Sequence, residues 1–284
     1  MAARLTSTST AGERRRAATT VGGRDRAATR VGGQDHAETT AGGRDRAATV
    51  ASGRRRAAAS AVRLSQRDID GLLLSGDHYG AQLDLLATAL GVQPERMPAI
   101  AARWRRVGYA ATGRLGPGPA WCWLTRDGMA ATGLGFPADR PALGRLAHIR
   151  AVLAARLWLT ASPAWADGQA WWRSERRLHA ARPAAGRDEH VADAEIHWPS
   201  IPGARYAGQV WAIEVELTPK PIARTSRILD ELLSCMRYAH VIYLTASAAR
   251  PVVTRAAASL GAGDQLRVVI RDLPAFAFAE DTPR

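Results

Sequence analysis

The chain has 284 residues and a formal net charge of +13, enough for one large domain or two small ones and basic enough to favour a polyanionic partner, most commonly nucleic acid. Its two cysteines, Cys122 and Cys235, lie far apart in sequence, which argues against a zinc site or a disulfide framework and is typical of a reducing cytosol. No apolar run reaches the roughly 18–20 residues that span a bilayer, and the N-terminus has no apolar signal core, so we expect a cytoplasmic protein without a membrane partner.

The first segment, residues 1–62, is dominated by a ten-residue repeat that begins at residue 11. Each unit has a pair of glycines or a similar pair, then a charged triplet, then Ala-Ala-Thr. Because nearly all of its apolar residues are alanine, the segment has too little surface to bury, and we predict a disordered basic tail. It is either an arm that contacts phosphates or a DNA-level tandem repeat translated from a start too far upstream; we favour the second interpretation.

The next segment, residues 63–136, predicts three helices and a hairpin. A Ser N-cap and helical apolar spacing indicate a helix over 65–76, and leucines on one face indicate a second that Gly91 ends. A third helix starts at Pro94, where proline is tolerated in the first turn. A GPGP turn then separates two short strands that end near Trp123. These elements predict one small domain.

The third helix separates an apolar face from a basic one. Ile100, Trp104 and Val107 form the apolar face. We predict that DNA is contacted by the basic face and by the turn of the hairpin, through Arg96, Arg103, Arg105, Arg106 and Arg114. Because Arg103 and Arg106 lie off the apolar face, their replacement with Ala is expected to leave the fold intact.

The stretch RWRRVGYAATGRLGPGPAWCWLTRDG resembles the winged helix-turn-helix of bacterial DNA-binding proteins. The family pattern is a recognition helix ending in Arg-x-x-x-Gly-Tyr, a two-stranded wing, and then Leu-Thr-x-x-Gly. The resemblance implies duplex DNA as the partner. The alternative is a winged helix used for protein contacts, in which Trp104 is simply a core residue.

A connecting helix is predicted within residues 137–165, and its apolar residues suit packing between two domains. Residues 166–276 then alternate between strand and helix patterns, which implies an α/β layer with a partly parallel sheet. The predicted elements are helices over 171–182, 225–239 and 254–262, and strands over 190–199, 208–217, 239–246 and 265–273.

Several carboxylates of this α/β layer lie at positions where the strands would bring them together. We expect Asp193 to end one strand, and Glu214 and Glu216 to share a face of the next, because residues i and i+2 of a strand point the same way. Negative charge on an apolar strand is costly unless a cation compensates it. Mg²⁺ would do so with Asp193 and Glu214 as ligands, and with Glu175 as a further ligand. Alternatively, these acids pair with Arg176, Arg177 or Arg224.

The same residues resemble the motif of the restriction-endonuclease-like fold, which is Pro-Asp, a spacer, and then Asp or Glu, any residue, and Lys. Asp193 and Glu214 match its acids, but Ala192 replaces the proline and Glu216 stands at the lysine position. Lys220, the one lysine of the chain, follows four residues later between two prolines. The resemblance implies a catalytic set of Asp193, Glu214 and Lys220, with metal ligands Glu175, Asp193, Glu214 and Glu216. The alternative is a nuclease-like scaffold with a degraded site.

Other chemistry has little support in the sequence. The seven histidines do not cluster at zinc spacing, and His190 and His197, which flank Asp193, are as readily surface residues. No glycine-rich phosphate loop follows a strand, and no Cys–His or Ser–His pairing is indicated.

The winged helix, a helix with His148, a helix with Glu175, then Asp193 and the Glu-Val-Glu strand follow one another over residues 65–272. In this order they resemble the replication-relaxation family of actinobacterial plasmids and integrative elements. We therefore predict an α/β (α+β overall) protein, in which a winged helix-turn-helix precedes a restriction-endonuclease-like domain. The resemblance implies a DNA-binding protein involved in plasmid replication or DNA relaxation, with replication or transfer proteins or a second copy as further partners. A Mg-dependent nuclease or nicking accessory, and a transcriptional regulator with an interaction platform, are the alternatives.

Overall fold

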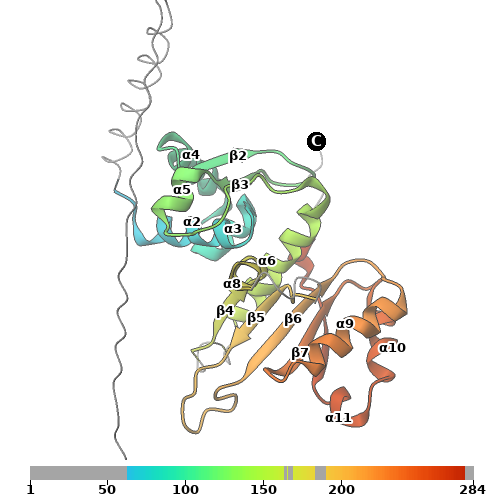
Figure 1. Cartoon of the computed structure of the whole chain (residues 1–284). Coiled ribbons are helices and arrows are strands. Elements are labelled where there is room, and N and C mark those ends of the chain that lie inside the picture. Colours follow the sequence, from blue (N-terminus) through green and yellow to red (C-terminus); the bar gives the residue numbers. More distant parts are fainter. Residues whose placement is uncertain (1–62, 163–164, 166–168, 183–189, 279–284) are drawn as a thin grey trace, which may run out of the picture. The chain divides into compact units, whose positions relative to one another are not determined.

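The computed structural model describes residues 63–162, 165, 169–182 and 190–278, so the predicted tail over residues 1–62 lies outside the described residues. The chain divides into two units, residues 1–46 and 47–284, and every described residue belongs to the second. Within the described ranges the chain forms nine α-helices, a three-stranded antiparallel sheet and a five-stranded mixed sheet (Figure 1). This is the mixed α/β class expected from the sequence.

The first part of the described chain contains the predicted helices and hairpin. Its elements are α2 (Gln66–Asp77), β1 (Ala81–Gln82), α3 (Leu83–Leu90), η1 (Pro94–Arg96), α4 (Met97–Arg106), β2 (Ala110–Gly113), β3 (Trp121–Leu124) and α5 (Arg126–Ala131). Ser65 caps α2 reciprocally with Asp68, and Gly91 ends α3 with a φ of 60°, as the sequence indicates. The strand β1 was not predicted, because two residues carry no periodic pattern; it pairs with β3, so the sheet order is β1-β3-β2.

The second part contains the larger sheet. Its elements are η2 (Leu143–Arg145), α6 (Leu146–Thr160), β4 (Trp171–Ser174), α8 (Glu175–Ala181), β5 (Ala194–His197), β6 (Val210–Glu216), α9 (Ile222–Ser234), β7 (Tyr238–Thr245), α10 (Arg250–Ala258), α11 (Ala262–Gln265), β8 (Val268–Asp272) and η3 (Ala275–Ala277). The strand order is β4-β5-β6-β7-β8. The pairs β4–β5 and β5–β6 are antiparallel, whereas β6–β7 and β7–β8 are parallel, so the predicted partly parallel sheet is confirmed.

One predicted element is wrong in its first four residues. The sequence predicts a single helix over residues 171–182, but residues 171–174 form strand β4, which pairs with β5 from Trp171↔His197 to Ser174↔Ala194. Trp172 and Ser174 are buried while Trp171 is exposed, which is the alternation of a strand. The Ser174 hydroxyl then accepts from the backbone N–H of Arg177 and begins α8.

Helices cover both faces of the larger sheet. Figure 1 shows α9 and α10 on one face and α6 on the other. Alternate residues of β6 follow this division: Ala212 packs with residues of α9 and α10, whereas Ile213 and Val215 join the core that contains α6. Glu214 and Glu216 have the same parity as Ala212, so their side chains leave the strand on the α9 side.

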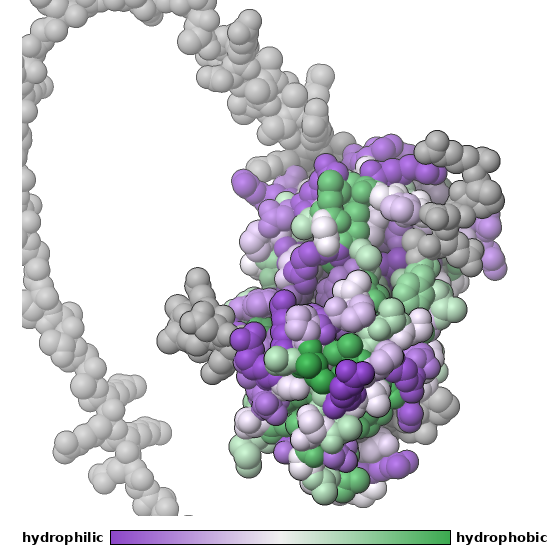
Figure 2. Space-filling model, turned by 90° about the vertical axis from the view of Figure 1, so that its right-hand side faces the viewer, coloured by the Kyte–Doolittle hydropathy of each residue, from purple (hydrophilic) through white to green (hydrophobic). Residues whose placement is uncertain are grey.

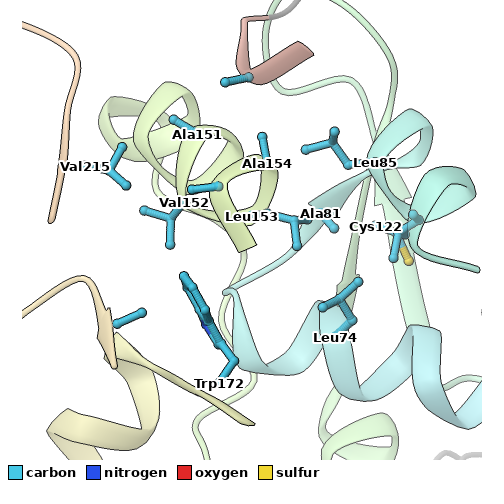
Figure 3. Packing of buried hydrophobic residues seen from close by; sticks show 14 of the residues in the cluster. Leu74, Ala81, Leu85, Cys122, Ala151, Val152, Leu153, Ala154, Trp172 and Val215 are labelled. Carbon is cyan, nitrogen blue, oxygen red and sulfur yellow. The ribbon is translucent and has the colours of Figure 1, made fainter. Parts of the chain in front are cut away.

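The predicted connecting helix α6 is part of the core of both parts. Residues 151–154 of α6 lie between Leu74 and Leu85 on one side and Val215 on the other (Figure 3). All of these side chains belong to one cluster of buried residues. The predicted boundaries after residues 136 and 165 therefore do not separate independent cores, since a single core runs from α2 to β7.

Two arginines of α8 form hydrogen bonds with the first part of the described chain. Arg176 of α8 is 5% exposed and donates to the carbonyls of Gly76, at 2.7 Å, and Pro137. Arg177 donates to Asp77 at 2.8 Å. The alternative in which these two arginines pair with the carboxylates of the sheet is wrong, because both reach toward the first part instead. Arg224 is exposed and forms no ion pair with another described residue.

The face of the molecule drawn in Figure 2 has no extended apolar area among its described residues. On this face, which includes α9 and α10, hydrophobic residues form small islands between hydrophilic ones (Figure 2). Among the helices that the structure describes, none is long and apolar enough to cross a membrane.

Candidate functional site

Three of the predicted carboxylates lie together at one end of the larger sheet. Glu214 and Glu216 are the last residues of β6 on its α9 side, where the parallel strands β6, β7 and β8 have their carboxyl ends. Asp193 directly precedes β5 rather than ending a strand, and the pairing Ala194↔Ile213 places it beside Glu214. Asp193, Glu214 and Glu216 are 9%, 3% and 6% exposed. Ligand sites of open α/β sheets form at this end of the strands.

Asp193 and Glu214 are each bound by a histidine. Asp193 accepts from the backbone N–H of Val215 at 2.8 Å, and its other oxygen lies 2.8 Å from Nε2 of His148 on α6. Glu214 Oε1 lies 2.8 Å from Nε2 of His190. Neither histidine is predicted as a partner by the sequence, because 45 and 24 residues separate them from these acids. His190 is therefore not a simple surface residue.

Glu216 and Glu175 are also bound by cations. The ammonium of Lys220 forms an ion pair with Glu216. Glu175, at the start of α8, accepts from Arg145 at 2.7 and 3.0 Å, and its Oε1 lies 3.5 Å from His179. No sequence signal points to Arg145, which comes from the 3₁₀ turn before α6.

Burial decides the electrostatics of the cluster. Removal from water, with a contribution from the charge of Asp193, raises the pKa of Glu214 to about 7, although His190 and Lys220 oppose the shift. Burial lowers the pKa of His190, but the hydrogen bond and charge of Glu214 outweigh it, and the net shift is upward. Burial, Glu214 and Glu216 raise the pKa of Tyr243, whose buried hydroxyl has no hydrogen-bond partner among the described residues.

The residues present do not fit a magnesium ion in this arrangement. Among the described residues, no group of three or more His, Cys, Asp or Glu side chains is placed to hold a metal. The predicted ligands Asp193, Glu214 and Glu216 accept from a backbone N–H, a histidine or a lysine, and Glu175 belongs to a separate ion pair. The predicted metal centre is thus not assembled among the described residues: each of these carboxylates has a protein partner, although His190 and Lys220 leave the pKa of Glu214 raised to about 7.

Lys220 lies near the cluster but on the wrong acid for the predicted motif. Its ammonium pairs with Glu216, at the motif's lysine position, rather than with Asp193 or Glu214. Its positive charge nevertheless opposes the upward shift of the Glu214 pKa. A catalytic role for Asp193, Glu214 and Lys220 stays a prediction.

The arginines predicted to bind DNA divide into two groups. Four of them are exposed and form no ion pair or hydrogen bond through their side chains with another described residue: Arg96, Arg105, Arg106 and Arg114. Arg103 instead forms an ion pair with Asp68, a carboxylate that is 2% exposed. Replacing Arg103 would therefore remove one partner of a buried carboxylate that also accepts from Ser65 and Trp104, so we expect a loss of stability in addition to any loss of DNA affinity.

Comparison of the chain with protein-family models, with curated proteins and with solved structures finds no match.

Proposed function

We propose that residues 63–136 form a winged helix that binds duplex DNA, and that the protein serves plasmid replication or DNA relaxation on a mobile element. The order of elements supports the first part of this proposal. Helix α2, strand β1, helices α3 and α4 and the hairpin β2–β3 follow one another as in a winged helix, with α4 at the position of the recognition helix. The hairpin supplies the wing.

The observation that carries the proposal is the unpaired arginine surface of α4 and the hairpin. Arg105 and Arg106 are exposed in the last turn of α4, and Arg114 is exposed just after β2. Since no described carboxylate holds these guanidinium groups, they are free to meet phosphates or base edges without breaking an internal ion pair. Such interactions release counterions, which gives binding a steep salt dependence.

The α/β layer is proposed to act as a scaffold rather than as a nuclease. Asp193, Glu214 and Glu216 are each paired with a protein side chain, His148, His190 or Lys220, and the sheet shares a core with the first part through α6. A scaffold of this kind sets the position of the DNA-binding part and offers surfaces to further partners.

The test measures the affinity of the full chain for a fluorescein-labelled duplex by fluorescence anisotropy over a range of salt concentrations. The double variant Arg105→Ala/Arg106→Ala should bind at least about tenfold more weakly, and its salt slope should fall by about one for each phosphate that is no longer neutralised. The matched control is Arg255→Ala/Arg271→Ala, which removes the same charge from exposed positions on α10 and β8. Equal losses of affinity in the two variants would mean that binding depends on net charge alone.

A plasmid-nicking assay separates the proposal from the nuclease alternative. The scaffold proposal predicts no difference between Mg²⁺ and EDTA. Nicking that needs Mg²⁺ and disappears in Asp193→Asn would instead establish the nuclease, with the carboxylates rearranged around the ion. A transcriptional regulator would bind duplex in the same way, and would be recognised by altered transcription from a bound promoter with unchanged plasmid copy number.

A further inference from the structure

A second surface of the protein combines an exposed indole with arginines. Trp171 begins β4, the edge strand of the larger sheet, and is 50% exposed. Its ring is stacked on that of His197 on β5, with centroids 3.9 Å apart and an interplanar angle of 16°. Because His197 covers one face of the indole, the exposed fraction of Trp171 is concentrated on its other face. Such a held, half-covered ring is a stacking platform for a further flat group.

The position of Trp171 places this platform beside a basic hollow. Arg173 follows two residues later, on the same side of β4 and about 7 Å along the strand. It lines a hollow of about 640 Å³, which is also lined by Arg237 and Tyr238. The guanidinium of Arg237 lies 4.8 Å from the centroid of the Tyr238 ring and its side chain is 47% exposed.

Two acids, Glu195 and Glu231, line this hollow together with its arginines. Glu195 lies on its floor and is fully buried, where it accepts from Tyr238 at 2.6 Å and forms ion pairs with Arg237 and, at 3.9 Å, Arg173. Its charge anchors the two arginines from below. Glu231, whose side chain is 38% exposed, pairs with Arg227 at 3.7 Å and accepts from the backbone N–H of His190 at 3.0 Å.

We propose that this surface binds single-stranded DNA, with a base stacked on the free face of Trp171 and backbone phosphates at Arg173 and Arg237. Aromatic faces interleaved with arginines along a groove are the means by which proteins bind single strands without regard to sequence. A duplex keeps its bases stacked on one another and has none to offer to Trp171. An acidic peptide would use the arginines but would leave the stacking face without a partner.

This inference rests on the proposed function in one respect, namely that DNA is the partner. It adds a site for separated strands, which a protein of plasmid replication meets wherever the duplex is opened. Duplex at α4 and single strand at β4 would then be bound by two parts of the chain that share a hydrophobic core through α6.

The experiment compares the affinities of the full chain for fluorescein-labelled dT20 and for a duplex by anisotropy. Trp171→Ala should weaken dT20 binding about 5- to 140-fold, which corresponds to the loss of one stacked base, and should change duplex binding less than twofold. The matched control Trp158→Ala removes a similarly exposed indole, 40% exposed on α6, and should leave dT20 binding unchanged. Trp171→Phe keeps a stacking face and should lose less affinity than Trp171→Leu, which keeps only apolar bulk.

The Phe and Leu variants decide the question if Trp171→Ala fails to fold. Equal dT20 affinities for Phe and Leu, or unchanged affinity in Trp171→Ala, would overturn the inference. So would a wild-type chain that binds duplex but not dT20, and in that case the proposed function would stand. A chain that binds neither probe would overturn both, whereas equal losses of affinity for duplex and dT20 in Trp171→Ala would overturn the separate single-strand site and make β4 part of the duplex site.

Discussion

Replacing Arg150 with methionine is expected to lower the free energy of unfolding by about 3 kcal/mol. Arg150 lies in the middle of α6 and is 5% exposed. Its guanidinium donates to both carboxylate oxygens of Asp84, at 3.0 and 2.7 Å, to Gln82 at 2.6 Å, and to the carbonyl of Phe276 at 2.9 Å. One side chain thus joins α6 to α3, to β1 and to the segment after β8.

The size of this loss in unfolding free energy follows from the polar groups that lose their partner when Arg150 is replaced. Methionine fills the volume of the aliphatic stem, but it leaves the buried oxygen of Gln82 without this donor and the carboxylate of Asp84 without its cation. Removing one partner of a buried ion pair typically costs about 3–5 kcal/mol. The side chain of Asp84 is 32% exposed and regains some water, so the lower end applies. For a chain of this size, about 3 kcal/mol corresponds to a fall in Tm of about 6–12 °C.

The assay is thermal and urea unfolding of the two variants Arg150→Met and Arg255→Met. Arg255 on α10 is exposed and forms no ion pair with another described residue, so its replacement should change the free energy of unfolding by less than about 0.5 kcal/mol. A double-mutant cycle with Asp84→Asn should show destabilisations that do not add, because the two residues act as a pair. A destabilisation below about 1 kcal/mol in Arg150→Met would refute the reasoning, since the buried hydrogen bonds would then contribute little.

Two further predictions concern pH. Burial would raise the pKa of Asp68, but hydrogen bonds from Ser65, Trp104 and Arg103 lower it from 3.8 to about 2. The ionised carboxylate therefore stabilises the fold above pH 3.8, and this contribution is lost as the pH falls toward 2. In urea titrations, the stability advantage of the wild type over Asp68→Asn should therefore shrink by about 2 kcal/mol between pH 5 and pH 2, and a constant difference would contradict the hydrogen-bonded geometry. Burial and Asp193 raise the pKa of Glu214 from 4.5 to about 7. The wild type therefore loses stability as the pH rises from about 4.5 to about 7, because the folded state holds the proton more tightly than the unfolded state. The upward-shifted pKa of His190 acts in the same direction. The stability of Glu214→Gln relative to the wild type should accordingly increase from pH 5 to pH 8 in thermal scans, and a decrease over this range would refute the assignment of Glu214 as a buried, proton-binding carboxylate.

Much of the fold follows from local patterns in the sequence. Ser65 and Gly91 mark the ends of helices through their capping chemistry, and the apolar spacing of α3, α4 and α9 indicates which face of each is buried. The parity of Glu214 and Glu216 along β6 correctly places both carboxylates on one side of the sheet. These features depend on residues within one or two turns of each other, so they can be predicted without knowledge of distant partners.

The partners of the carboxylates were decided by the tertiary structure alone. His148 reaches Asp193 from α6, His190 reaches Glu214 from the chain before β5, and Arg145 reaches Glu175 across 30 residues. Nothing in the sequence near an acid tells whether a metal ion or a distant cation will neutralise it. The packing decides which partner each buried carboxylate meets, so the pairs of Asp193, Glu216 and Glu175 are a property of the fold, and burial leaves Glu214 with a raised pKa.

The sequence by itself determined most of the longer helices and strands and their order, the basic face of α4 and the crowding of acids at β6. Tertiary structure decided that residues 171–174 form a strand, because only pairing with β5 compensates for a four-residue segment that carries no strand pattern of its own. It also decided that Arg103 forms an ion pair with Asp68 while Arg105 and Arg106 are exposed to solvent, although all three lie on the same short helix. The physical reason is the same in each case: secondary structure responds to neighbours along the chain, whereas burial and charge compensation depend on the residues that folding brings into contact.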